Sequence, residues 1–537
     1  MTTPTTPPEA ADSSSAGAGQ VPAQPGAPAD EGLDRELLLV ASVVVLGAVM
    51  SILDVTVVNV AIPTLVTDFE TTLSTIQWVA TGYTLALATV IPLSGWGSDR
   101  FGTKRLYMAS IAMFVTGSLL SGMAWSSGSL IGFRILQGFG GGLIMPLGMT
   151  IMTRAAGPQR LGRVMAVMGV PMLLGPVFGP ILGGWLVDDF SWRWIFFINL
   201  PIGVFALFLA ARVLPRDVSN HEHRLDWLGL LLLSPSLAAL IYGLAQTASD
   251  TDAQGRQTGG GFGHAIVLVP MIAGAIGLLV FGRHALRART PLVDLRVFSN
   301  RVFTASTVTL MLMVISVFGG MLLMPVYLST VRGESAMDIG LLLAPQGLGA
   351  MLAMPISGRL ADKTAVGRIV PFGLLTIGAS FLALTQLEAD TSYWAFGAVL
   401  FVQGIGMGFS MMPLFSGAMQ TLRAAHIANA STTLNIMQQV SASVGTAVMS
   451  VILTNEIVER MNAAFTGSGG QPPAGSPDQQ REALAPIVAP AFGATFWWAV
   501  GLVAVAFVVA LVLLPKQKPE PVADDDPEGV PAAVMMG

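Results

Sequence analysis

The sequence predicts an all-α membrane protein with fourteen transmembrane helices, arranged as two six-helix bundles plus two inserted helices. Composition is the first observation behind this fold class. Hydrophobic residues make up 53% of the 537 residues and charged residues only 11%, less than half of the share of about 25% in soluble domains. The other two observations are long apolar runs and a pair of repeated motifs. The runs lack the alternation of a membrane β-barrel.

Each apolar run is long enough to span a bilayer, because a hydrocarbon core of about 30 Å needs roughly 20 residues of helix. The fourth run contains Arg134, and the thirteenth is rich in Ser, Thr, Asn and Gln. The predicted spans are residues 36–63, 74–94, 106–125, 129–152, 163–187, 193–213, 226–248, 263–284, 302–328, 338–357, 369–387, 394–416, 428–454 and 490–514.

The basic residues orient these helices. With the N-terminus in the cytoplasm, 21 of the 27 Lys and Arg residues fall in cytoplasmic segments and five fall outside, while Arg134 lies within a span. This asymmetry follows the positive-inside rule. The high Ala and Gly content favours a bacterial source. We therefore expect a multi-pass protein of the bacterial cytoplasmic (inner) membrane with both termini in the cytoplasm.

Composition also divides the chain into segments. Residues 1–35 and 516–537 are polar and are predicted to be disordered cytoplasmic tails, and residues 461–482 are predicted to be a long, flexible outside loop. The N-terminal tail lacks the features of a signal peptide. We expect an N-terminal bundle at 36–213, two inserted helices with cytoplasmic linkers at 214–301, and a C-terminal bundle at 302–515.

Two motifs recur along the chain. GWGSDRFGTKR, which begins at Gly95, returns as GRLADKTAVGR from Gly358, and LQGFGGGLIMP at 136–146 returns as VQGIGMGFSMMP at 402–413. Both repeats share one register, so spans 1–6 are expected to repeat as spans 9–14. Two such halves, related by an axis along the membrane normal, are typical of secondary transporters, whose substrate site lies between the repeats.

Four motifs resemble those of the major facilitator superfamily, and in particular its fourteen-span drug:proton antiporter group. The Gly95 loop is similar to the signature between spans 2 and 3. LDVTVVNVAIP at 53–63 resembles the first-span motif, FRILQGFGGG at 133–142 the fourth-span Arg motif, and GPVFGPILGGWL at 175–186 the fifth-span antiporter motif. The resemblance covers both halves of the chain. It implies the major facilitator fold, multidrug efflux in exchange for protons, and a part in antibiotic resistance.

Asp54 and Arg134 are the two charged residues that lie well inside the predicted spans, away from the span ends. Each costs roughly 2.5–3.5 kcal/mol at mid-membrane, and a helical rise of 1.5 Å per residue places both about 8–14 Å below the outer surface. They form either a static ion pair that fixes helix packing or, as the resemblance implies, a proton-coupling site. Because Leu400 stands at the repeat position that matches Arg134, only the N-terminal half is expected to couple protons.

The Gly95 loop is either a topogenic turn or a breakable latch that stabilises one access state, and the resemblance favours the latch. Its glycines permit a tight turn and close helix approach, and Asp99 can pair with Arg100 or cap the next helix. The second copy has Lys363 at the position of Arg100. The cytoplasmic latch candidates are Gly95, Asp99, Arg100, Gly102, Lys104, Arg105, Gly358, Asp362, Lys363, Gly367 and Arg368.

Small residues and prolines recur in the fifth span. They form either a packing face for another helix or a hinge between the halves, as the resemblance implies. The hinge candidates are Gly175, Pro176, Gly179, Pro180, Gly183 and Gly184. Most polar residues inside the spans are expected to join helices. Among them, the candidates for a substrate cavity are Asn59, Gln77, Gln137 and Gln346.

The chain has no Cys and no GxxxxGK[ST] motif, and its five His residues lie in loops or at span ends. These features argue against thiolate sites, ATP hydrolysis, an enzyme and a metal site, and the net charge of −5 argues against nucleic-acid binding. We predict a monomeric proton-coupled antiporter without a cofactor, which exports hydrophobic or amphipathic compounds by rocker-switch alternating access. Export of an endogenous lipid or secondary metabolite is the main alternative, followed by import or symport and by a non-transporting membrane scaffold or sensor.

Overall fold

The computed structural model describes residues 35–156, 160, 164, 167, 175, 178–179, 181–215, 225–247, 262–288, 291–422, 426–465 and 476–517. Every regular element among these residues is helical. In chain order the elements are α1 (Arg35–Asp68), α2 (Leu73–Val90), α3 (Leu93–Phe101), α4 (Thr103–Gly122), α5 (Ser127–Ala156), α7 (Trp194–Phe197), α8 (Asn199–Val213), α9 (Trp227–Ala245), α10 (Ala265–Arg287), η1 (Leu295–Ser299), α11 (Arg301–Tyr327), η2 (Leu328–Arg332), α12 (Ala336–Lys363), α13 (Val366–Leu384), α14 (Tyr393–Gln420), α15 (Ile427–Phe465) and α16 (Pro477–Leu513).

Eleven spans in the described part of the chain are long and apolar enough to cross a membrane, and the bent pair α2–α3 makes twelve if it is one span. The two most polar of the predicted spans, α5 with Arg134 and α15, are among the eleven. The 20-residue α4 packs lengthwise on α5. Most of the predicted fifth span lies outside the described residues. The all-helical membrane fold is confirmed, and the count of fourteen is consistent with it.

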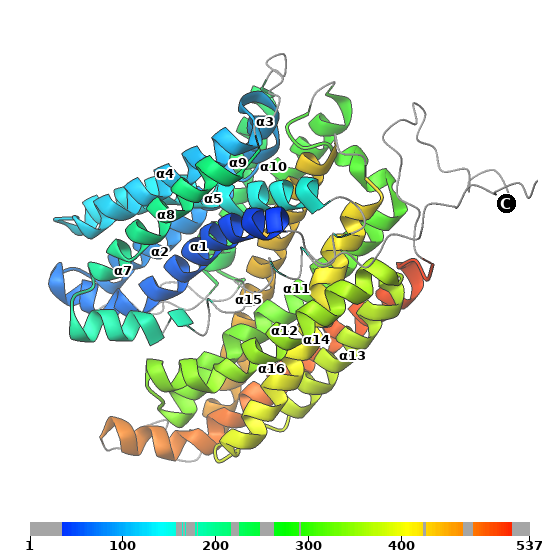
Figure 1. The fold of residues 1–537 in the computed structure, drawn as a ribbon. Coiled ribbons are helices and arrows are strands. Elements are labelled where there is room, and N and C mark those ends of the chain that lie inside the picture. The colour runs from blue at the N-terminus through cyan, green and yellow to red at the C-terminus, as the bar shows by residue number, and fades with distance from the viewer. Residues whose placement is uncertain are drawn as a thin grey trace, which may run out of the picture.

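The helices group into two bundles (Figure 1). In the first, α5 packs between α2 and α4, and α1 packs on α5 and α8. In the second, α14 packs on α12 and α13, while α11 packs on α15 and α16. The inserted helices α9 and α10 pair with each other, and α9 rests on α2.

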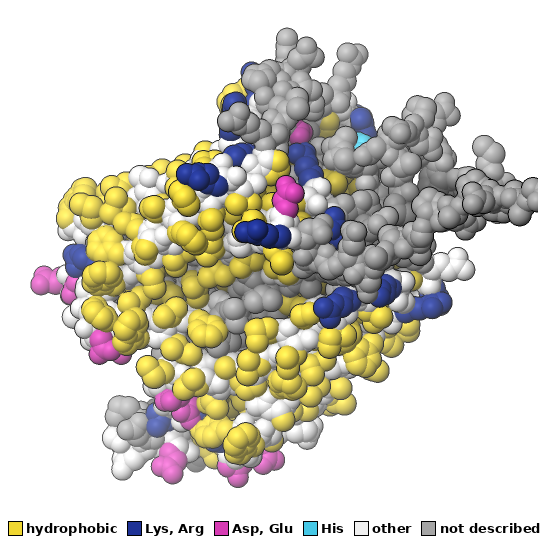
Figure 2. All heavy atoms as spheres, in the orientation of Figure 1, with side chains coloured by type: hydrophobic (Ala, Val, Ile, Leu, Met, Phe, Trp, Pro, Cys, Tyr) yellow, Lys and Arg dark blue, Asp and Glu magenta, His cyan; other side chains and the backbone are white. Residues whose placement is uncertain are grey.

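Charged side chains gather at the two ends of the bundles, with apolar surface between them (Figure 2). Such a belt suits a bilayer, where exposed apolar side chains meet lipid. At one end, here called the basic end, lie the helix termini with Arg35, Lys104, Arg154, Arg212, Arg287, Arg301, Arg359, Arg368 and Lys516. At the other, here called the acidic end, lie Asp68, Glu70, Asp188, Asp189, Glu334, Asp338, Glu388, Glu456 and Glu482.

The second span is bent rather than straight. The sequence predicted one helix over 74–94, but α2 ends at Val90 and α3 continues at an angle of 56° to it. Pro92 stands immediately before α3. Its ring removes a backbone N–H and crowds the carbonyl of the preceding turn, and this disrupts a helix. The first part of the Gly95 motif is therefore helical and is not a loop.

The prediction of a flexible loop over residues 461–482 is wrong at both ends of that range. Helix α15 continues to Phe465, and α16 already begins at Pro477. Ser476 and Gln479 form a reciprocal capping box that starts α16, and a proline follows at its first position, where its missing N–H costs nothing. Hydropathy locates the part of a helix that lies in lipid, whereas capping determines where the helix begins.

Candidate functional site

The two intramembrane charged residues are in direct contact. Nη1 of Arg134 on α5 donates a hydrogen bond to Oδ2 of Asp54 on α1, at 2.5 Å. Both side chains are buried, with 1% and 0% of their surface exposed. Burial of an ion pair removes water from both charges, so the pair persists only when further hydrogen bonds satisfy the remaining polar atoms.

Two amides supply further donors to the carboxylate. Oδ1 of Asp54 accepts a hydrogen bond from Nε2 of Gln137 at 2.8 Å and from Nδ2 of Asn199 at 3.1 Å. Gln137 and Asn199 are themselves buried. Three donors from α5 and α8 therefore stabilise the anionic form of Asp54 in a region from which water is excluded.

The guanidinium of Arg134 has its own supports. Its Nε donates to the backbone oxygen of Val79 at 3.2 Å, and its Nη1 also lies 2.9 Å from Oε1 of Gln137. Its central carbon sits 4.1 Å from the centre of the Tyr83 ring and 5.7 Å from that of Phe196, where the ring faces attract a cation. Arg134 thus has acceptors besides Asp54.

Glycines on α5 allow this cluster to form. A Cβ on Gly138 would lie 2.6 Å from the backbone oxygen of Tyr83, and one on Gly140 would lie 2.5 Å from the backbone nitrogen of Phe114. Both distances are shorter than any van der Waals contact, so α2 and α4 approach α5 only because these positions lack side chains. The close approach brings Tyr83 on α2 to the Arg134 guanidinium.

The sequence did not single out Asn199 or its neighbour Ser118. Asn199 lies at the start of α8, close to the predicted outer end of a span, where a polar residue is unremarkable. Nδ2 of Asn199 also donates to Oγ of Ser118 at 3.0 Å. Gln137, proposed from the sequence for a substrate cavity, instead contacts Asp54. Gln137 follows Arg134 by three residues, which places both on one helical face. This spacing was the sequence feature that could have predicted Gln137 as a partner of the ion pair.

Two charged residues of the Gly95 motif, Asp99 and Lys104, contact their own bundle. Oδ1 of Asp99 lies 3.8 Å from Nη2 of Arg154 on α5, a partner that the sequence did not predict, and Nη1 of Arg154 donates to Oγ1 of Thr103 at 3.0 Å. Nζ of Lys104 donates to the carbonyls of Ala211 and Leu214 at the end of α8. A cation there complements the helix dipole.

The turn in this motif is made by Gly102, whose φ of 86° joins α3 to α4. Arg100 is half-buried and Arg105 is exposed. Gly95, by contrast, is a point of close approach between the two bundles. A Cβ at Gly95 would lie 3.3 Å from the side chains of Asn429 and Thr432 on α15.

The bundles meet at the basic end through α15. Oγ of Ser94 and Oγ1 of Thr432 are 2.8 Å apart, and Ser431 donates to the backbone oxygen of Pro146 at 3.0 Å. Nδ2 of Asn435 lies 3.4 Å from Sδ of Met149. These bonds join α3 and α5 of the first bundle to α15 of the second, so this seam is closed at the basic end.

The second copy of the motif makes different contacts. Gly358 and Asp362 are buried near the end of α12, whereas Lys363 and Arg368 are exposed. The backbone N–H of Gly367 donates to the carbonyl of Pro515 at 3.2 Å, and a Cβ at this position would overlap that carbonyl. Gly367 therefore packs against the chain after α16.

The fifth-span glycines face α1. A Cβ on Gly175 or Gly179 would overlap the side chain of Ile52 or Thr56, and one on Gly183 would lie 3.1 Å from the backbone oxygen of Val57. Oγ1 of Thr56 donates to the carbonyl of Gly175 at 3.1 Å. Gly184 has open space around it, and Pro176 and Pro180 lie outside the described residues. Three of these glycines therefore pack on the helix that carries Asp54.

The remaining cavity candidates are dispersed. Gln346 is buried, and its Nε2 donates a hydrogen bond to Oε1 of Gln403 at 3.0 Å. Gln403 is the residue that occupies the repeat position of Gln137. Gln77 is half-buried near the start of α2, at the acidic end of the molecule. The side chain of Asn59 is outside the described part of the structure.

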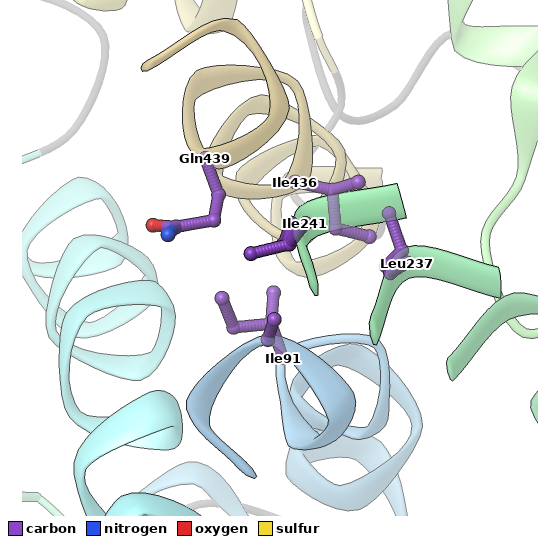
Figure 3. Close-up of a pocket in the computed structure, with 6 residues that line it drawn as sticks. Ile91, Leu237, Ile241, Ile436 and Gln439 are labelled. Atoms are coloured by element: carbon purple, nitrogen blue, oxygen red, sulfur yellow. The ribbon is translucent and has the colours of Figure 1, made fainter. Parts of the chain in front are cut away.

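A small hollow lies at the seam where α2, α9 and α15 meet (Figure 3). Its lining is apolar except for Gln439. Among the described residues, no group of three or more His, Cys, Asp or Glu side chains is placed to hold a metal ion. The lining residues are Ala88, Ile91, Leu237, Ile241, Ile436 and Gln439.

A protein-family model and several known relatives match most of the chain. The model of the Major Facilitator Superfamily matches residues 44–446. A multidrug resistance protein B homolog from Mycobacterium tuberculosis is 47% identical over 426 residues, which cover 79% of this chain and 77% of that protein. The multidrug export protein EmrB of Escherichia coli is 31% identical over 422 residues, which cover 78% of this chain and 81% of that protein.

A solved structure agrees in fold. The human organic anion transporter MFSD10 superimposes with a TM-score of 0.58 at 16% sequence identity, covering 89% of this chain and 100% of that chain. At this identity the likeness concerns the fold alone. Together with the family match over both bundles, it shows that this multi-pass membrane protein belongs to the major facilitator superfamily.

Proposed function

We propose that this protein is a proton-coupled exporter of hydrophobic or amphipathic compounds in the bacterial cytoplasmic membrane. The observation that carries the proposal is the buried cluster of Asp54, Arg134, Gln137 and Asn199. A carboxylate at this depth is costly, and it is the one acidic group in the cluster able to exchange a proton. Relatives named as multidrug resistance and multidrug export proteins support the substrate class.

The basic end is the proposed cytoplasmic side, because positive charge is retained there. Residues 36–213 then rock against residues 302–515 about the substrate site, in the manner of a rocker switch. Proton binding to Asp54 removes its negative charge and weakens its attraction to Arg134. This change in the first bundle is the proposed link between proton movement and the exchange of access.

The other motifs have proposed supporting roles. The Gly95 motif acts as a latch at the basic end, where Ser94 and Gly95 touch α15. The second copy, with Gly358, Asp362 and Gly367, supports the matching end of the second bundle. The fifth-span glycines let that span move closely along α1. The proton gradient supplies the energy, without a cofactor, and one chain is the proposed working unit.

Transport in inside-out vesicles tests the proposal. Vesicles that contain the protein and a pH-sensitive dye are acidified inside, and ethidium, tetraphenylphosphonium and a panel of neutral amphipathic compounds are added outside. We expect at least one compound to accumulate while protons leave the lumen. Asp54→Asn should abolish the proton release that each compound causes, because an amide does not exchange a proton in this pH range.

The matched control is Asp68→Asn, the same substitution on α1 at its acidic end, which should retain exchange. Proton release in Asp54→Asn at the rate of the parent protein would overturn the coupling role of Asp54. Accumulation of no compound in the panel, with no dissipation of the gradient, would overturn export of this substrate class. Control vesicles without the protein measure leakage.

A further inference from the structure

Asn199 connects the Asp54 carboxylate to a third helix. It is the first residue of α8, and 2% of its surface is exposed. One amide N–H points to Oδ1 of Asp54 at 3.1 Å and the other to Oγ of Ser118 on α4 at 3.0 Å. Both hydrogen atoms of the amide are therefore used inside the first bundle.

Ser118 determines which end of the amide faces Asp54. Oγ of Ser118 donates its own hydrogen to the backbone oxygen of Phe196 at 2.9 Å, so it can only accept from Asn199. The ionised carboxylate of Asp54 is also an acceptor. Both neighbours require the NH₂ end of the amide, and rotation of the amide would place its oxygen against two acceptors.

The two oxygens of Asp54 have different partners. Oδ1 accepts from the neutral amides of Gln137 and Asn199, whereas Oδ2 accepts from Arg134. Both lone pairs of Oδ1 are therefore occupied, and a proton there would displace a donor, whereas Oδ2 accepts only from Arg134 and has a second lone pair for a proton. Arg134 also has other acceptors at hand, since it already bonds the oxygens of Gln137 and Val79.

We propose that Asn199, oriented by Ser118, is a positioning residue that holds Oδ1 of Asp54 in both protonation states. The proton that enters down the gradient then binds at Oδ2 and neutralises the carboxylate, and the Asp54–Arg134 bond is the one that breaks. Arg134 keeps its charge and its bonds to Gln137 and Val79. This inference rests on the proposed function, because it assumes that Asp54 carries the proton.

Few other groups influence this proton among the described residues that pack around Asp54. Arg134 on α5 supplies the positive charge, and Tyr83 on α2 supplies a phenol that lies over Arg134 and near Ser51. The side chains that α4 and α8 contribute, Ser118 and Asn199, are neutral. A change at Asn199 therefore alters hydrogen bonding to Asp54 without altering the nearby charge.

Infrared spectroscopy of the purified protein tests the inference without a transported compound. The absorption of a protonated carboxyl group is followed against pH, and the Asp54 band is assigned by its loss in Asp54→Asn. Asn199→Ala should move the midpoint of this titration about one pH unit upward, because a lost donor disfavours the carboxylate more than the neutral acid. Ser118→Ala should move it in the same direction by less.

Two further variants separate positioning from packing. Asn199→Asp preserves the shape of the side chain but places a second carboxyl group beside Asp54, and it should raise the midpoint further than Asn199→Ala. Ser121→Ala is the matched control on α4, since Ser121 is equally buried and its hydroxyl has no hydrogen-bond partner in the described part of the structure. Its midpoint should equal that of the parent protein.

The outcomes distinguish the two proposals. If the parent protein shows no Asp54 band that titrates, the proposed function fails. If the band titrates but Asn199→Ala, Asn199→Asp and Ser118→Ala all keep the parental midpoint, the positioning role of Asn199 is overturned and its contacts serve packing alone. Shifts in the predicted order, with the Ser121→Ala midpoint unchanged, support the role.

Discussion

At the scale of the residue, one repeat position carries a charged side chain in the first half, Arg134, and an apolar one in the second half, Leu400. The first half places Arg134 and Gln137 against Asp54, whereas the second has the buried Leu400 and Gln403, and Gln403 bonds the neutral Gln346. The amide persists in both copies, but the charges occur in one. Since each buried charge needs a partner, the neutral Leu400 suits a helix on which Gln403 bonds another neutral amide.

The cost of an unpaired charge gives a residue-scale prediction. Arg134→Leu, which copies the second half, leaves the Asp54 carboxylate buried without its cation and should destabilise the folded protein by about 3–5 kcal/mol. The double variant Asp54→Asn with Arg134→Leu removes both charges and should recover much of that loss. Thermal unfolding in detergent at neutral pH measures both. Equal melting temperatures for the single and double variants would contradict this account of the pair.

At the scale of the element, the fifth-span glycines make a packing prediction with an internal control. Gly179→Ala places a methyl group on the Thr56 side chain of α1, whereas Gly184→Ala projects into open space. Overpacking of this kind costs about 1–3 kcal/mol. We expect Gly179→Ala to reduce both melting temperature and transport, and Gly184→Ala to leave both near the parental values. Equal effects of the two substitutions would exclude the close contact with α1.

We expect the inserted helix α9 to move together with the first bundle. Ser234 donates to the backbone oxygen of Thr89 on α2 at 2.6 Å, and the rings of Trp78 and Tyr242 stack with centres 5.8 Å apart. These two contacts lie near opposite ends of α2. The contact of α9 with α15 is apolar around Ile436 and includes the pocket of Figure 3. An apolar contact slides more readily than a hydrogen-bonded one, because no directional bond has to break.

Cross-linking tests which bundle α9 follows, and the parent chain has no Cys to interfere. The pair Thr89→Cys with Ser234→Cys joins α9 to α2 and should retain transport after treatment with a short bifunctional maleimide. The pair Leu237→Cys with Ile436→Cys joins α9 to α15 and should lose transport. Inhibition by the first pair but not by the second would assign α9 to the second bundle.

At the scale of the whole molecule, the structure shows one access state at the α15 seam. The bonds between Ser94 and Thr432 and between Ser431 and Pro146 close the basic end. Alternating access requires that these bonds break during each cycle. They involve only neutral hydroxyl groups and a backbone oxygen, so their rupture does not expose an unpaired charge.

A reversible lock at this seam tests the cycle. Ser94→Cys with Thr432→Cys should form a disulfide on oxidation, because the two side-chain oxygens that the sulfurs replace are 2.8 Å apart. The oxidised protein should stop transport and the reduced protein should resume it, while each single variant stays active under both conditions. Full transport by the cross-linked protein would show that this seam need not open.

Much of the molecule is predictable from the sequence, because lipid imposes simple requirements. Every backbone polar group in the bilayer must be bonded internally, so long apolar runs become helices, and the basic residues mark one side. The shared depth of Asp54 and Arg134 also follows from arithmetic on rigid helices, since each residue adds 1.5 Å of depth. These features depend on position along a helix and on little else.

The side-chain contacts between helices were decided by the tertiary structure alone, because they depend on how each helix is rotated and how closely it approaches its neighbours. Asn199 and Ser118 join the Asp54 cluster because α8 and α4 present those faces inward, which depth along a helix does not specify. The same holds for the pairing of Asp99 with Arg154 and for the contact of the fifth-span glycines with α1. Sequence by itself determined the helices, the sidedness of charge and the depth of two buried residues. The partners of those residues required the packing of all the helices together, because a hydrogen bond depends on ångström-scale geometry between segments distant in the chain.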